Sequence, residues 1–285
     1  MADISIRQMR ETDLEAAMGL KNAEGWNQTE LDWRLFLDHN PELCLVACVE
    51  EEVIGTVAAI NYKNEVAWIG MMLVSHDFRK QGVGSRLLEA VITRLEGCAS
   101  IKLDATPTGK PVYQKQGFVE ELVLHRMTIQ KLPALSDRLN PGEIRIIQET
   151  DIPEIARLDQ FAFGGDRTQL IRRVIETLPD QSWMSVRAGS VSGFLLGRVG
   201  TRFNHLGPVV AGSIEDAKAL FAQVTKALSG KPVVMDVPAG QTAWVGWLSE
   251  MGFLHQRSLF RMYLNKNNRG EKGDLQFAIM GPELG

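Results

Sequence analysis

Residues 65–84 read EVAWIGMMLVSHDFRKQGVG, and this stretch, which continues into SRLLEAVITRLEG, decides the expected fold. Its apolar run at 68–74 predicts a buried strand. After a polar turn, apolar residues recur on one face of a predicted helix: Leu87, Leu88, Val91, Ile92 and Leu95. A strand that passes through a glycine-containing turn into a helix is a typical anion-binding arrangement, because the first helical N–H groups have no partner inside the helix.

The turn before this helix combines small residues with positive charge. Gly82 and Gly84 have no Cβ, so that a phosphate can approach the backbone closely, and Arg79 and Lys80 carry charge at the same end. Two common phosphate-binding fingerprints do not fit. The Rossmann pattern requires a third glycine where Leu87 stands, and a P-loop requires Gly-Lys-Ser/Thr at the turn. The alternatives left are a pyrophosphate site of another kind and a plain strand–helix turn.

The sequence RKQGVG at 79–84 has the spacing Arg-x-x-Gly-x-Gly, which resembles motif A of the GCN5-related N-acetyltransferase (GNAT) superfamily. A second signature of that family, Tyr-x-x-x-Gly-Phe at the end of a helix, is matched at 113–118. Thr106 stands where the family often has an asparagine, seven residues before the tyrosine. The resemblance implies an α/β fold, with a mixed, mostly antiparallel twisted sheet flanked by helices.

The resemblance also implies that the chain is an N-acetyltransferase with acetyl-CoA as its co-substrate. In this chemistry the Val74 N–H would stabilise the oxyanion, and Tyr113 would protonate the departing sulfur as a general acid. The residues implied to bind acetyl-CoA are Met72, Leu73, Val74, Arg79, Lys80, Gln81, Gly82, Val83, Gly84, Ser85, Thr106 and Tyr113. The alternative for Tyr113 is a packed aromatic side chain whose hydroxyl caps a neighbouring group.

The sequence does not single out a base for the acceptor amine. Asp104 follows a predicted strand beside the thioester site, and Glu24 lies in the early loop that lines the acceptor pocket in the family. Each can equally be a structural carboxylate, and an ordered water chain could serve instead. Trp26 is a candidate wall of the acceptor pocket, and Asp236 is a candidate for closing it from the second half of the chain. We expect a small-molecule acceptor with a primary amine.

The chain contains an internal duplication. Four short anchors recur at an offset of 135 or 138 residues: Glu-Thr-Asp (11–13 and 149–151), Val-x-Gly (53–55 and 191–193), Gly-Phe (117–118 and 252–253) and Arg-Met (126–127 and 261–262). Such constant spacing predicts two copies of one fold. We therefore expect two tandem GNAT-like domains, an N-terminal acetyltransferase domain over 1–132 and a C-terminal one over 143–285, joined by a linker at 132–142. The apolar run at 275–280 is predicted to dock as a strand.

The second copy lacks residues that the chemistry requires. Residues 211–216 follow its apolar strand but contain no Arg-x-x-Gly-x-Gly, and Leu248 stands where the first copy has its tyrosine. Ser213 is predicted to cap the next helix, whereas Glu215 and Asp216 in its first turn would repel a diphosphate. We expect this copy to be degenerate, without a coenzyme site of the same kind.

Composition argues against several other functional classes. The 285 residues carry a formal net charge of −4 with a sequence pI of about 5.8, which argues against a nucleic-acid-binding surface and slightly favours a cationic substrate. No apolar run approaches a membrane span, and the first residues do not form a signal-peptide pattern. The three cysteines form no disulfide framework or metal-binding pair. We expect a cytoplasmic protein, monomeric or homodimeric, with no metal, nucleic-acid or membrane partner.

A second hypothesis is a non-catalytic acyl-CoA sensor or interaction module. Coenzyme binding alone requires the turn at 79–85 but no proton donor, so that the presence of Tyr113 favours an enzyme. A third hypothesis, a nucleotide-phosphate enzyme, lacks the Lys-Ser/Thr pair and the acidic partner that it would need.

Overall fold

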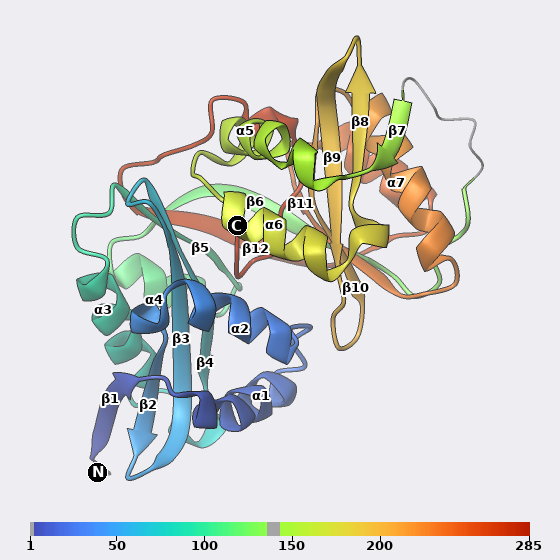
Figure 1. Ribbon diagram of the computed structural model, residues 1–285. Coiled ribbons are helices and arrows are strands. Elements are labelled where there is room, and N and C mark those ends of the chain that lie inside the picture. The colour runs from blue at the N-terminus through green and yellow to red at the C-terminus, as the bar shows by residue number, and fades with distance from the viewer. Residues whose placement is uncertain (1–2, 136–142) are drawn as a thin grey trace.

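The computed structural model describes residues 3–135 and 143–285. Thirteen strands of this described chain form one sheet, which runs from the first repeat into the second (Figure 1). The strand order is β1-β2-β3-β4-β5-β12-β6-β11-β10-β9-β8-β7, and β13 pairs with β10. The mixed, mostly antiparallel sheet with its flanking helices confirms the predicted fold class. Most of the predicted linker lies outside the described residues.

The two repeats contain the same succession of elements. The first consists of β1 (Ile4–Gln8), α1 (Leu14–Ala23), α2 (Glu30–His39), β2 (Leu45–Val49), β3 (Glu52–Tyr62), β4 (Val66–Val74), α3 (Val83–Arg94), β5 (Ser100–Ala105), α4 (Lys110–Lys115) and β6 (Val119–Ile129). The second consists of β7 (Glu143–Ile146), α5 (Ile152–Phe163), α6 (Thr168–Thr177), β8 (Trp183–Arg187), β9 (Ser190–Arg198), β10 (Asn204–Ala211), α7 (Ile214–Leu228), β11 (Val233–Pro238), α8 (Thr242–Glu250) and β12 (Leu254–Asn265), followed by β13 (Gln276–Ala278).

Equivalent residues form equivalent turns in the two repeats. Arg7 donates two hydrogen bonds to the Asp13 carboxylate, at 2.7 and 2.8 Å, in the turn before α1. Arg145 donates the same pair to Asp151, at 2.6 and 2.7 Å, in the turn before α5. The duplication inferred from the sequence is therefore a structural repeat, and the prediction of a tandem protein is confirmed.

The repeats exchange their last strands. β6 pairs with β11 of the second repeat, and β12 is inserted between β5 and β6 of the first. Two buried ion pairs connect the exchanged strands. Arg126 donates to the Asp236 carboxylate through Nε and Nη2, each at 2.8 Å. Arg261 donates to the Asp104 carboxylate in the same way, at 3.0 and 3.1 Å. Neither repeat completes its part of the sheet with its own last strand, a feature that the sequence did not predict.

A hydrophobic core is shared between the repeats. One large cluster contains Trp33 and Phe36 of α2 together with Ile155 of α5 and Ile171 of α6. Trp33 is fully buried there, as expected of a core residue on a helical face. Two further clusters pack α3 against the first half of the sheet, and α7 and α8 against the second half. The described helices therefore cover both faces of the sheet (Figure 1).

The two repeats differ at the place where two parallel strands of the sheet separate. β4 and β5 are parallel and are paired only at Ala67–Ile101 and Trp68–Lys102, after which they separate. β10 and β11 are paired in the same way at Asn204–Val233 and His205–Val234. In the second repeat β13 occupies the separation, because it pairs with β10 and the following Ile279 N–H donates to the Asp236 carbonyl at 2.9 Å. The predicted strand at 275–280 is thus confirmed in its central part.

The segment after β13 connects the repeats. It continues from the second repeat to β3 and β4 of the first. The Trp68 indole on β4 donates to the Pro282 carbonyl at 2.9 Å, and the Tyr62 hydroxyl at the end of β3 donates to the Leu284 carbonyl at 3.0 Å. Glu283 packs so closely on Gly70 that a Cβ at Gly70 would lie 2.8 Å from the Glu283 Cα. This segment fixes one wall of the cavity described below.

Candidate active site

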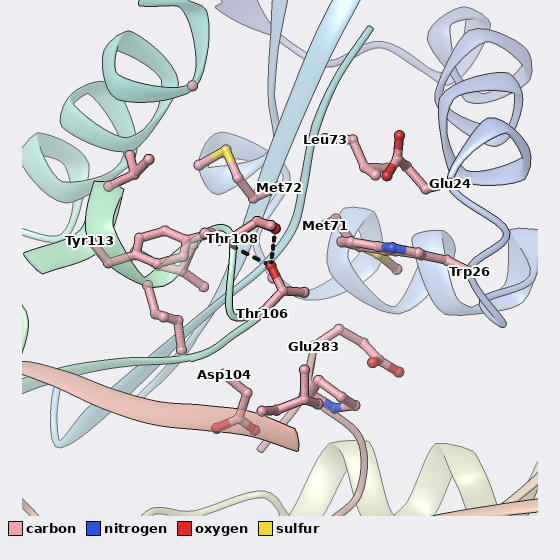
Figure 2. Close-up of a pocket in the computed structure, with 18 of the residues that line it drawn as sticks. Glu24, Trp26, Met71, Met72, Leu73, Asp104, Thr106, Thr108, Tyr113 and Glu283 are labelled. Atoms are coloured by element: carbon pink, nitrogen blue, oxygen red, sulfur yellow. Dashed lines mark hydrogen bonds between the residues drawn. The ribbon is translucent and has the colours of Figure 1, made fainter. Parts of the chain in front are cut away.

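A cavity of about 740 Å³ lies at the separation of β4 and β5. Figure 2 shows Tyr113 on one side of it, Glu24 and Trp26 on the opposite side, and Asp104 and Glu283 at a third wall. Most of the residues predicted to hold the coenzyme or the acceptor line this cavity: Glu24, Trp26, Met72, Leu73, Val74, Arg79, Lys80, Gly84, Asp104, Thr106 and Tyr113. The lining does not include Gln81, Gly82, Val83, Ser85 or Asp236.

The backbone of β4 is irregular where it borders the cavity. Met71 adopts φ 52°, and the register with β3 shifts between the Thr56 and Ala58 pairs. The Thr56 hydroxyl donates to the Met71 carbonyl at 2.8 Å and holds this bulge. Residues 73 and 74 stay paired with β3 on one edge of β4. Because bulges redirect backbone groups and β5 has already diverged, the other edge of β4 at 72–74 borders the cavity rather than a strand.

The turn before α3 has the backbone conformation of an anion-binding loop. Lys80 and Gly82 adopt left-handed φ angles of 61° and 82°, and Gly82 is the N-cap of the 12-residue helix α3. Such alternation of backbone conformation makes N–H groups converge on one point, and the free N–H groups of the first helical turn add to it. Arg79 and Lys80 line the cavity at this end.

Tyr113 lies on the short helix α4 and faces the cavity. Its ring packs edge-on against Phe118, with ring centroids 6.1 Å apart, and its hydroxyl makes no hydrogen bond with any residue that the structure describes. Burial raises the pKa of Tyr113 to about 12. Thr106 holds the start of α4, because its hydroxyl accepts from the Gly109 N–H at 3.1 Å. The departure from asparagine at this position therefore leaves the turn intact.

Glu24 caps the end of α1 at the cavity edge and contacts the segment that leads into α3. Its Oε1 accepts a hydrogen bond from the Arg79 guanidinium and lies 2.5 Å from His76 Nε2. Arg79 also donates to the Val74 carbonyl at 3.2 Å. The sequence did not indicate a partner for His76, because Glu24 is 52 residues away in the chain. Glu24 Oε2 has no hydrogen bond within the described chain.

The two candidate aspartates are engaged by arginines. Asp104 lines the cavity, but both of its oxygens accept from Arg261. Burial raises the pKa of Asp104 to about 6, although the Arg261 charge opposes this shift. Asp236 was expected to line the cavity, but it does not. It binds Arg126, and Arg126 lines the cavity. Asp236 therefore contributes to the cavity wall through Arg126.

Three charged lining residues were not predicted from the sequence: Arg126, Arg257 and Glu283. Glu283 accepts from Arg198 at 2.7 Å and from the Gln28 amide at 2.9 Å, and is fully enclosed by these contacts. Only Arg126 had a signal in the sequence, as one of the repeated Arg-Met anchors. The other two reach the first repeat through the exchanged strand β12 and the segment after β13.

The equivalent region of the second repeat is built differently. The Ser213 hydroxyl accepts from the Asp216 N–H at 3.2 Å, which confirms the predicted cap of α7. Asp216 is also neutralised by Arg187 at 2.9 Å, so that the repulsion expected from its charge is reduced. In addition, β13 fills the separation of β10 and β11, the counterpart of the separation that borders the cavity in the first repeat.

Two features are absent from the described residues. Over 3–135 and 143–285, no helix is long and apolar enough to cross a membrane. The same residues contain no group of three or more histidine, cysteine, aspartate or glutamate side chains that could hold a metal ion.

Comparison with known families gives matches to both repeats. Residues 6–118 match the model of the acetyltransferase (GNAT) family, and residues 155–278 match the model of an acetyltransferase (GNAT) domain. Together, these matches include most of the residues that line the cavity and most of the second repeat.

Individual relatives cover most of the chain. The uncharacterized N-acetyltransferase YitH of Bacillus subtilis is 27% identical over 218 residues, which is 76% of either chain. The holothin acyltransferase of a Pseudoalteromonas species is 27% identical over 267 residues, 92% of this chain and 88% of the relative. A solved structure from Pyrococcus horikoshii has a TM-score of 0.84 at 21% identity, covering 100% of this chain and 97% of that one. A tandem GNAT protein of the clavulanic acid biosynthesis pathway has a TM-score of 0.65 at 12% identity, covering 92% and 98%.

Proposed function

The chain belongs to the GNAT superfamily of acetyltransferases, as a tandem protein with a degenerate second domain, and we propose that it transfers an acetyl group from acetyl-CoA directly to a primary amine. The observation that carries this proposal is the open separation of β4 and β5. It has a turn with the conformation of an anion-binding loop at one end, and beside it a tyrosine hydroxyl without a hydrogen bond to any residue of 3–135 and 143–285.

The coenzyme would extend along this opening. Its pyrophosphate would lie on the N–H groups of the turn at 80–85, with Lys80 supplying charge. Its pantetheine arm would pair with the backbone of β4 at 72–74, since β5 no longer occupies that edge. The thioester would then lie between β4 and α4.

The transfer requires one bond to form and one to break. The amine nitrogen attacks the thioester carbonyl carbon, and the Val74 N–H stabilises the resulting oxyanion, a contribution of about 10²–10³ in rate for a single donor. When the carbon–sulfur bond breaks, Tyr113 donates its proton to the sulfur. The raised pKa of Tyr113 keeps this proton in place at neutral pH.

Glu24 is the better placed of the two candidate bases. Both oxygens of Asp104 are occupied by Arg261, whereas Glu24 lies at the cavity edge with an Oε2 that has no hydrogen bond to a described residue. The proton lost by the amine would pass to Glu24, directly or through a water molecule. Trp26 would form the adjacent wall of the acceptor site.

One coenzyme per chain is the stoichiometry that this arrangement favours. The second repeat lacks Arg-x-x-Gly-x-Gly and has Leu248 instead of a proton donor. β13 also occupies the strand edge that a pantetheine arm would need. The role of the second repeat would be to complete the sheet and to supply the acceptor end of the cavity.

The proposal is tested by measuring coenzyme-thiol release from acetyl-CoA in the presence of a panel of primary amines. We expect amine-dependent release and an N-acetylated product in the mass spectrum. Acetyl-CoA binding without release for any amine would favour the non-catalytic sensor, and absence of binding would contradict both. Glu24→Gln should lower turnover while acetyl-CoA affinity is retained.

A further inference from the structure

The cavity continues into a second, smaller one at its acceptor end. This second cavity measures about 210 Å³ and shares Glu24, Arg126 and Arg257 with the first. Arg202 lines only the smaller cavity and donates to the Gly25 carbonyl at 3.0 Å. The junction is therefore lined by one carboxylate and several guanidinium groups from both repeats.

Most charged groups around the junction already have counter-ions. Glu24 is bound by Arg79, Asp104 by Arg261 and Glu283 by Arg198. Arg126, on the exchanged strand β6, is neutralised by Asp236.

Arg257 has no such partner. It makes no hydrogen bond or ion pair with any described residue, and its Nε atom is buried without an acceptor. Lys80, at the coenzyme end, is likewise without an ion-pair partner within the described ranges, and there the proposed function already expects a phosphate. Arg257, the cation at the other end of the cavity without an ion-pair partner among the described residues, therefore indicates a binding site for a second anion.

The position of Arg257 lowers the stability of the fold, so that stability does not explain why an arginine is there. Arg257 on β12 and Arg126 on β6 are direct partners across antiparallel strands, and like charges at such positions repel. Burial and the neighbouring Arg126 charge lower the pKa of Arg257. A register shift between His255 and Arg257 marks a bulge, a feature that redirects side chains next to functional sites. A buried donor without an acceptor adds a further cost.

We propose that the acceptor is an amine that also carries a carboxylate, and that Arg257 binds this carboxylate. The inference rests on the proposed N-acetyltransferase function and names its substrate class. The planar guanidinium matches a carboxylate through two parallel hydrogen bonds. An acceptor bound in this way extends from the smaller cavity toward Glu24, which lines both cavities and receives the amine proton. This local charge outweighs the slight preference for cationic substrates that the net charge suggested.

The first test compares amino acids with their own carboxamides as acceptors, at saturating acetyl-CoA. The wild type should prefer the acids, and in Arg257→Gln the ratio of kcat/KM for acid over carboxamide should fall by at least about 30-fold. Arg257→Lys keeps the charge but not the planar fork and should fall between the two. Arg173→Gln removes an exposed charge on α6, outside both cavities, and should leave the ratio unchanged.

The second test requires no acceptor. If Arg257 is retained for binding, Arg257→Gln relieves its repulsion with Arg126 and should raise the Tm by about 1–3 °C. Arg173→Gln again serves as the control. A lower Tm in Arg257→Gln would show that Arg257 is a structural residue and would overturn the inference.

The remaining outcomes separate the inference from the proposed function. A wild type that binds acetyl-CoA and acetylates amines without preferring the acids overturns the inference alone, as does an unchanged ratio in Arg257→Gln. A wild type that does not bind acetyl-CoA overturns the proposed function, and the inference with it. If acetyl-CoA binds but no member of the panel reacts, the Tm comparison decides.

Discussion

Tyr113 lines the cavity, and its hydroxyl makes no hydrogen bond to any described residue, so that it is free for the proposed role of proton donor. Tyr113→Phe removes the hydroxyl but keeps the ring on Phe118. We expect turnover to fall by about 10²-fold while acetyl-CoA affinity stays within twofold, because only the departing sulfur needs the proton. Single-turnover kinetics together with calorimetry measure the two quantities. Unchanged turnover would exclude Tyr113 as the acid.

The buried His205 on β10 leads us to predict a loss of folding stability at acid pH. It is buried, and its pKa is lowered to about 4, first by burial and then by the Arg198 charge. Its unfolded-state pKa is about 6.5, so that the unfolded chain binds a proton that the folded chain does not between these values. The stability contribution is therefore complete above pH 6.5 and is lost as the pH falls toward 4, by about 3 kcal/mol.

This contribution is measured as a difference between variants. Urea unfolding of the wild type and of His205→Gln at pH 7.5, 5.5 and 4.5 should show the wild type losing more stability on acidification. Comparing the two proteins at each pH cancels the titration of carboxylates such as Asp104. Parallel pH profiles would contradict the assignment.

At the scale of elements, the left-handed residue at the start of α3 is the most sensitive point of the proposed coenzyme site. Gly82 has φ 82°, and a Cβ there would meet nothing within 4 Å, so that Gly82→Ala strains only the backbone. We expect a loss of about 1 kcal/mol in stability and at least a tenfold weaker affinity for acetyl-CoA, because the N–H groups of the turn move.

Gly97 provides the matched control for this variant. It follows the same helix, has φ 89° and also has open space at its Cβ position. Gly97→Ala should cost similar stability but leave acetyl-CoA affinity unchanged, since it lies at the other end of α3. Equal affinities in the two alanine variants would mean that the turn at 79–84 is plain architecture.

The sequence predicted the elements and motifs of the first repeat better than it predicted which segments of the second repeat complete the cavity. The spacing of Arg79, Gly82, Gly84 and Tyr113 is local, and local spacing is visible in a single sequence. Thr106 shows how local chemistry tolerates replacement, because a hydroxyl accepts the hydrogen bond at the start of α4. For the second repeat, the sequence showed the missing motif, Leu248 and the charges at 215–216, but it did not show that β13 fills the strand separation, because no local pattern encodes this long-range pairing.

At the scale of the whole molecule, the exchanged strands make the two repeats interdependent. The buried Arg126–Asp236 pair connects β6 to β11, and Arg126→Met would leave Asp236 charged, buried and without its main partner. Breaking one side of a buried pair costs about 3–5 kcal/mol. Urea denaturation measures this loss.

The control for this variant is an exposed pair. Arg34→Met removes the surface contact with Glu30 on α2, where we expect a much smaller loss of stability because solvent screens exposed pairs. A similarly small loss for Arg126→Met would show that the exchange contributes little to stability.

The exchange also explains why Arg257 and Glu283 were missed. They are distant in sequence from the motifs of the first repeat, and they reach its cavity only because β12 and the segment after β13 cross into it. The duplication was readable from constant offsets, but offsets carry no information about which copy of a strand completes which sheet. The domain ranges 1–132 and 143–285 stay a prediction for the same reason.

The central claim is that this tandem protein has one working acetyl-CoA site, in the first repeat. Calorimetric titration of the full chain with acetyl-CoA tests it most directly, because the stoichiometry is read independently of the acceptor. We predict one molecule bound per chain, and loss of that binding in Gly82→Glu. Two molecules per chain would contradict the obstruction of the second repeat by β13, and no binding at all would contradict the assignment of the cavity between β4 and β5.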